Sequence, residues 1–69
     1  MAINYILEEL DSKIESLEKE IEKAKSEYNK CRYRCESAGV TSVYAEIIRI
    51  HEAKKEAFEE ARNIVMEML

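Results

Sequence analysis

The sequence predicts an all-α protein, a two-helix antiparallel coiled-coil hairpin that forms one domain over residues 1–69. Apolar residues recur with the 3,4 spacing of a coiled-coil seam. The chain also has one glycine, no proline and 38% charged residues, so turn residues are too few for an all-β fold. We expect a first helix over about residues 3–37, a turn at about 38–41 and a second helix over about 42–68.

Composition limits the class of protein. The hydrophobic core of a 69-residue chain seldom supplies more than about 3 to 5 kcal/mol of folding stability. We therefore expect a second copy or a helical partner protein to complete a helical bundle. The net charge of -4 argues against binding to nucleic acid or to an anionic membrane. No basic leader and no long apolar run is visible, and two cysteines suit a reducing compartment, so the sequence predicts a cytoplasmic protein.

The first helix carries a single narrow apolar seam. Charged residues flank it on both sides, as a solvated coiled coil requires. The seam positions are Ile3, Leu7, Leu10, Ile14, Leu17, Ile21, Ala24, Tyr28, Cys31, Cys35 and Ala38. After them, Gly39 can adopt the left-handed conformation past a helix end, and Thr41 or Ser42 can cap the next helix.

The second helix carries an apolar stripe two residues wide, which indicates more than one neighbour. Its members are Val43, Tyr44, Ile47, Ile50, His51, Ala57, Phe58, Ala61, Ile64, Val65 and Met68, with Lys54 interrupting its middle. Folding the helices together pairs Leu17 with Ala61 and Tyr28 with His51, and leaves the start of the first helix overhanging. The predicted partner-binding face therefore comprises Ile3, Ile6, Leu7, Leu10, Val43, Ile47, Ile48, Ile50, Phe58, Ile64, Val65 and Met68.

Few residues could support chemistry. Cys31 and Cys35 lie one turn apart and, with His51, raise the possibility of a zinc site, but two small seam residues are the simpler interpretation. Carboxylate pairs such as Glu15 and Glu18, or Glu56 and Glu59, resemble magnesium ligands but suit a solvated face. One histidine and one glycine allow no catalytic triad or phosphate loop, so we expect a protein that is not an enzyme, with no cofactor or metal.

A basic cluster closes the first helix and continues beyond the turn. Positive charge at a helix carboxyl end compensates the helix dipole. Alternatively, the cluster binds a phosphate-bearing ligand or an acidic partner. Its residues are Lys30, Arg32, Tyr33, Arg34, Arg49 and His51.

The charged heptads, the mid-chain turn with Gly39, the aromatic Tyr44 and the alanine-rich segment 52–65 resemble the small co-chaperones of type III secretion needle subunits. That resemblance implies pairing with a helical-repeat chaperone to hold a needle subunit monomeric. The sequence predicts first a chaperone or adaptor that binds a helical partner through its apolar stripe. The alternatives are a self-assembling small regulator or inhibitor, of the kind phages encode, and an oligomer that binds anions through the basic cluster.

Overall fold

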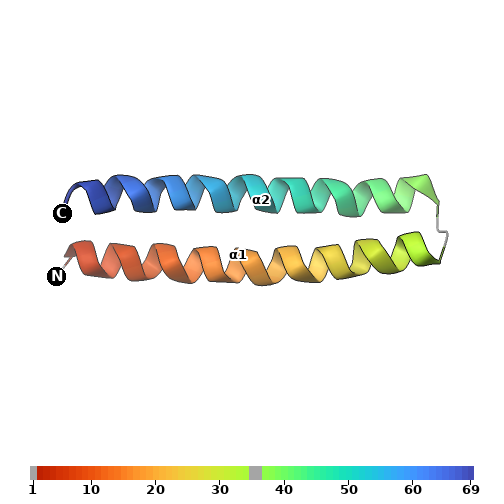
Figure 1. The fold of residues 1–69 in the computed structure, drawn as a ribbon, viewed down its shortest axis with the longest axis horizontal. Helices are drawn as coiled ribbons and strands as arrows, with labels where there is room; N and C mark the ends of the chain where they lie inside the picture. Colours follow the sequence, from red (N-terminus) through yellow and green to blue (C-terminus); the bar gives the residue numbers. More distant parts are fainter. Residues whose placement is uncertain (1, 35–36) are drawn as a thin grey trace.

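The computed structural model describes residues 2–34 and 37–69 and folds them into two antiparallel helices (Figure 1). Helix α1 spans Ala2–Tyr33 and helix α2 spans Ala38–Glu67. Residues 2–34 and 37–69 contain no strand and no third helix. The predicted all-α helical hairpin is confirmed.

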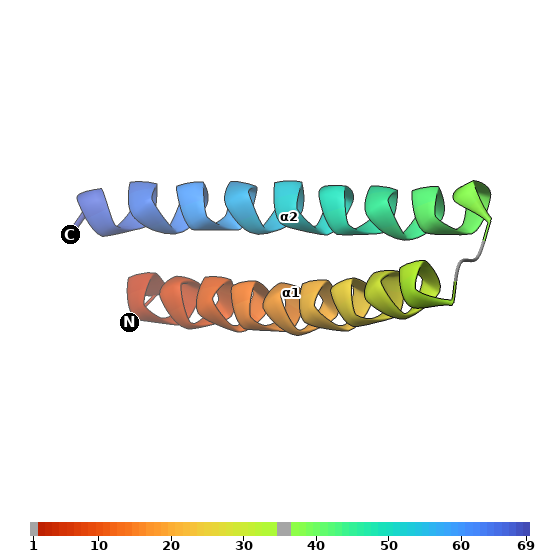
Figure 2. The same ribbon diagram turned by 45° about the vertical axis from the view of Figure 1, so that its right-hand side comes forward.

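The hairpin is a thin rod. It measures 51 × 14 × 11 Å, and its radius of gyration is 15.7 Å, whereas a compact chain of this length has about 11 Å. The two helices run side by side in both views (Figures 1 and 2). With only two helices packed together, the outer faces of both are left without a neighbour.

The predicted seam of α1 faces α2. Every seam position from residue 3 to residue 31 is buried or half-buried, while most positions between them are exposed. Among the described residues the most buried are Ile21 and Ala24, each 7% exposed, and Cys31, 5% exposed. The 3,4 spacing therefore identified the contact face of α1. Cys35, the next seam position, lies outside the described residues.

The turn comes earlier in the chain than predicted. Helix α1 ends at Tyr33, and α2 begins at Ala38 with Ser37 as its N-cap, whose hydroxyl accepts a hydrogen bond from the Val40 amide at 3.4 Å. The predicted turn at 38–41 and the predicted caps at residues 41 and 42 are therefore wrong. The apolar spacing continues as far as Ala38, so the pattern did not show that Ser37, the first serine after α1, already caps α2.

Two residues in the first turn of α2 have different roles from those predicted. The Thr41 hydroxyl donates a hydrogen bond back to the Ala38 carbonyl at 3.0 Å, which is the behaviour of a residue inside a helix. Gly39 is helical, and its φ does not lie in the left-handed region. Glycine is thus not required for the chain to turn at this position.

The early turn shifts the pairing of the helices by about one helical turn. Leu17 shares a surface groove with Ala57 and Phe58, not with Ala61, and His51 shares one with Ala24. The predicted overhang of the first helix is also wrong. The helices have 32 and 30 residues, and both chain ends lie at the same end of the rod (Figure 1).

Candidate partner-binding face

The wide apolar stripe of α2 is divided lengthwise by the packing. Its inner half faces α1 and is half-buried, and it includes Tyr44, Ile48, His51, Phe58 and Val65. Its outer half, which we call the α2 stripe, continues the same 3,4 spacing one residue to the side. The α2 stripe consists of Val43, Ile47, Ile50, Lys54, Ala57, Ala61, Ile64 and Met68.

The large side chains of the α2 stripe are mostly open to solvent. The exposed fractions are 57% for Val43, 41% for Ile50, 58% for Ile64 and 70% for Met68. A single exposed apolar side chain is ordinary on a protein surface, but a continuous row at coiled-coil spacing is typical of an interaction site. The α2 stripe therefore has the pattern of a helix-packing seam without a helix against it.

The opposite long side of the hairpin is covered by charged residues. Three described ion pairs cross between the helices, and they lie along this side. Lys25 Nζ is 3.7 Å from Glu52 Oε2, and Lys55 Nζ is 3.9 Å from Glu18 Oε2. Those four residues line one groove. The third pair joins Arg62 Nε to Asp11 Oδ1.

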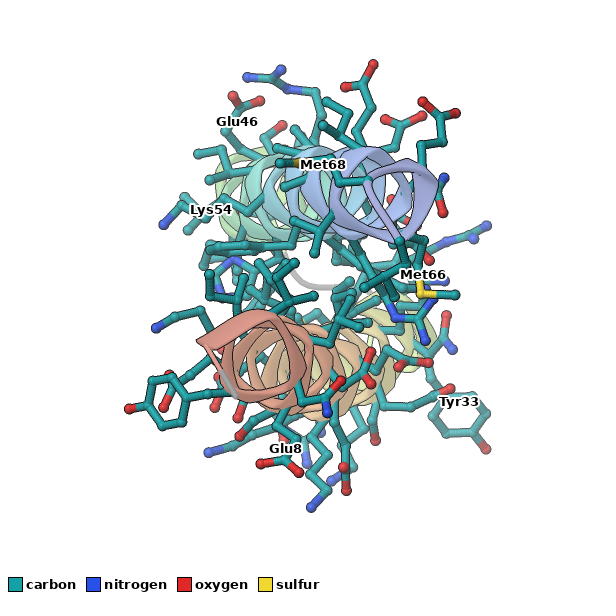
Figure 3. The ribbon with its side chains drawn as sticks, turned by 90° about the vertical axis from the view of Figure 1, so that its left-hand side faces the viewer. Glu8, Tyr33, Glu46, Lys54, Met66 and Met68 are labelled. Carbon is teal, nitrogen blue, oxygen red and sulfur yellow. The ribbon has the colours of Figure 1, made fainter. Side chains whose placement is uncertain are left out.

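Figure 3, viewed from the end that carries both termini, makes the two sides visible. Lys54, in the middle of the α2 stripe, points to one side of α2, and Met66 points to the other. Lys54 lines a groove with Lys13 and Leu17 of α1. The hairpin thus has one long side covered by ion pairs between the helices and one long side that carries the α2 stripe.

The structure separates the residues predicted for the partner-binding face into two groups. Ile3, Leu7, Leu10, Ile48, Phe58 and Val65 are half-buried, and Ile47 is half-buried within the α2 stripe. Ile6 is 44% exposed and lies one heptad before Lys13, so it is on the same long side as Lys54. Of the residues predicted for this face, Ile6 and the exposed members of the α2 stripe are the ones that remain available to a partner.

One exposed aromatic was not identified from the sequence. Tyr5 is 64% exposed, and a hydrogen bond with Glu9 raises the pKa of its hydroxyl. Tyr5 lies outside the 3,4 spacing of the seam, and that departure from the pattern could have marked it as a surface residue.

The structure brings together only part of the predicted basic cluster. Lys30, Tyr33 and Arg34 line one shallow groove, and Tyr33 is 91% exposed. Lys30 Nζ lies 3.5 Å from Glu27 Oε1, so a carboxylate offsets its charge. The guanidinium carbon of Arg32 lies 5.8 Å from the centre of the Tyr28 ring. This cation–π geometry holds Arg32 along its own helix.

The remaining two members of the cluster lie elsewhere. Arg49 forms an ion pair with Glu46 within α2, and its hydrogen bond lowers the pKa of the Glu46 carboxyl and raises the pKa of Arg49. His51 lines a groove with Glu20 and Glu27, and its Nδ1 atom is buried without a hydrogen-bond partner. Arg49 is thus paired with a carboxylate and His51 lines a different groove from Lys30, Tyr33 and Arg34, so the described residues do not gather all six members into one anion site.

The residues considered as metal ligands do not form a metal site within the described part of the chain. Cys31 is buried in the seam, and Cys35 lies outside the described residues. Over residues 2–34 and 37–69, no three His, Cys, Asp or Glu side chains lie close enough to hold a metal ion. Two of the glutamates with magnesium-like spacing instead lie near lysines, Glu15 near Lys19 at 3.5 Å and Glu18 near Lys55.

No protein-family model, curated protein or solved structure matches the chain. Within the described part of the chain, neither helix has the length and apolar character needed to cross a lipid bilayer.

Proposed function

We propose that the chain is a non-catalytic protein-interaction module that binds an α-helix of a partner protein along the α2 stripe. The observation that carries the proposal is a 3,4 row along one side of a 30-residue helix that is apolar except for Lys54, and in which every large apolar side chain except that of Ile47 is exposed. Laying a helix along such a row is a common mode of protein recognition, with anchors at i, i+3, i+4 and i+7.

The energetics support a docked helix. Ile50 and Ile64 are 41% and 58% exposed, and fully burying an isoleucine side chain contributes about 1.5 to 3 kcal/mol. Two such anchors, with Val43 and Met68 at the ends, offer enough apolar surface to offset part of the cost of ordering a bound helix. Lys54 adds a positive charge in the middle of the row, which favours a partner with a carboxylate at that level.

The chaperone or adaptor role is the form of this module that we place first. A hairpin with one charged side and one apolar side can shield an aggregation-prone helix while keeping the complex soluble, as the resemblance to type III secretion co-chaperones implies. We place the module in the cytoplasm, because a chain with only two cysteines suits a reducing compartment.

The test is a pull-down that compares the original chain and two variants as bait. The double variant Ile50→Glu with Ile64→Glu puts two charges into the α2 stripe, and Met66→Glu puts one charge on the opposite side of the same helix at a residue 45% exposed. The proposal expects a helical protein that is bound by the original chain and by Met66→Glu but lost from the double variant. Circular dichroism should show equal helicity in all three forms. Equal binding by all three would contradict the proposal.

A further inference from the structure

We infer that the helix occupying the α2 stripe is α2 of a second copy of this chain, packed antiparallel about a two-fold axis between residues 55 and 56. This inference rests on the proposed function, because it names the partner of the same surface. Surface area, side-chain size and charge along the α2 stripe each support it.

The surface area matches what a dimer would bury. The chain exposes 5363 Å². A compact monomer of 8.1 kDa exposes about 4,500 Å². The excess, about 900 Å², is close to the roughly 800 Å² that each partner buries in a stable protein interface. Burying the α2 sides of two hairpins together would thus bring each chain near the exposed area of a compact protein.

Side-chain sizes along the α2 stripe fit an antiparallel pair. With the axis between residues 55 and 56, Ile50 faces Ala61 of the second copy, and Lys54 faces Ala57 of the second copy. Ile47 faces Ile64 of the second copy, and the end residues Val43 and Met68 also meet. Large residues then face small ones through the centre of the pair, as efficient helix packing requires.

A parallel, in-register pair fits poorly. It would place Lys54 directly against Lys54 of the second copy inside an apolar seam, where two like charges repel strongly. It would also place Ala57 and Ala61 against themselves and leave space unfilled. The antiparallel arrangement removes both problems.

Charge favours the same arrangement. In the antiparallel pair, Glu60 of the second copy, which directly precedes Ala61 of the α2 stripe, lies beside the alanine that Lys54 faces. The two-fold axis repeats this contact, so each Lys54 ammonium group lies beside one carboxylate of the other copy. The chain therefore supplies a partner carboxylate for Lys54 at the middle of the apolar row.

The first experiment measures mass in solution by sedimentation equilibrium over a hundredfold range of concentration. We expect the original chain to have twice the mass of 8.1 kDa. Ile64→Glu should raise the dimer dissociation constant at least about tenfold, because a charge then replaces a buried anchor. Met66→Glu is the matched control and should leave it unchanged. If Ile64→Glu loses helicity, Ile50→Glu takes its place.

The second experiment determines whether the two α2 helices of the dimer run antiparallel or parallel. A carbodiimide joins lysines directly to carboxylates in an equal mixture of ¹⁵N-labelled and unlabelled chains, and mass spectrometry identifies the peptides joined between copies. We expect Lys54 joined to Glu60 across the dimer. These residues are six apart on one helix, an axial distance of about 9 Å, so neither an intrachain contact nor a parallel pair would join them.

The possible outcomes separate this inference from the proposed function. A chain that stays monomeric at every concentration, a dimer that tolerates Ile64→Glu, or a dimer without the Lys54 to Glu60 product would each overturn the antiparallel pair. A monomer that still binds another helical protein through the α2 stripe would overturn only the inference. Binding that ignores the α2 stripe altogether would overturn the proposed function as well.

Discussion

Arg62, near the end of α2, forms an ion pair with Asp11, near the beginning of α1, although 51 positions separate them in the chain. This contact sets the two helices level with each other near the termini. Lys55 with Glu18 and Lys25 with Glu52 continue the same alignment toward the turn. The three pairs together define the register of the hairpin.

We expect Asp11→Asn and Arg62→Gln each to lower the free energy of unfolding by about 0.2 to 1 kcal/mol, because both side chains are partly solvated. The double variant should lose less stability than the sum of the losses in the two single variants. The charge-reversed pair, Asp11→Arg with Arg62→Asp, should recover part of that stability. Urea denaturation measures all four. Full additivity of the two single losses would show that these residues do not interact.

Ile21 is the large residue with the most complete burial in the described core, so its truncation should be costly. We expect Ile21→Ala to lower the free energy of unfolding by about 2 to 5 kcal/mol, a large share of the stability of so small a domain. Tyr33→Ala, in the same helix at a residue 91% exposed, is the control and should change it by less than about 0.5 kcal/mol. Thermal unfolding followed by circular dichroism compares the two variants.

Gly39 distinguishes the observed turn from the predicted one. Its backbone is helical, and an added Cβ would meet only the Ser37 hydroxyl oxygen, at 3.9 Å. We therefore expect Gly39→Ala to raise the free energy of unfolding by about 0.5 to 1 kcal/mol, since alanine loses less entropy than glycine in a helix. If Gly39 were in the left-handed conformation, Gly39→Ala would instead lower the free energy of unfolding. The urea midpoint decides between them.

Ser37 caps α2, so its hydroxyl should contribute measurably. We expect Ser37→Ala to lower the free energy of unfolding by about 1 kcal/mol, because the Val40 amide loses its side-chain acceptor. Ser37→Asp should retain the cap and interact favourably with the helix dipole. Ser42→Ala, inside α2, is the control for losing a hydroxyl. An equal effect of the two alanine variants would contradict the assignment of the cap.

The ion pair between Glu46 and Arg49 predicts that the stability of the fold depends on pH. Arg49 lowers the folded pKa of Glu46 below its ordinary value of 4.5, so the carboxylate stabilises the fold above that pH and loses this contribution as the pH falls through the folded pKa. Glu46→Gln should therefore be less stable than the original chain at neutral pH and converge with it in acid. Glu8→Gln, which changes a side chain that points away from α2 (Figure 3), is the control.

The seam of α1 illustrates what local pattern can reveal. A 3,4 spacing selects one face of a helix through geometry within that helix alone, and nine successive positions from Ile3 to Cys31 were assigned to the correct face. The width of the α2 pattern likewise indicated that half of it would have no place in a simple hairpin. The basic cluster was less predictable, because closeness in the chain did not reveal that Arg49 pairs with Glu46 and that His51 lines a separate groove.

The sequence by itself thus determined two long helices, their antiparallel pairing and the seam of α1, because these follow from helical periodicity and composition. Only the tertiary structure decided where the turn lies, which residues meet across it and which half of the α2 pattern stays exposed. Those features depend on the cap at Ser37 and on contacts such as Asp11 with Arg62. A periodic pattern keeps its face when it slides by a helical turn, so spacing alone cannot choose among registers that such contacts separate.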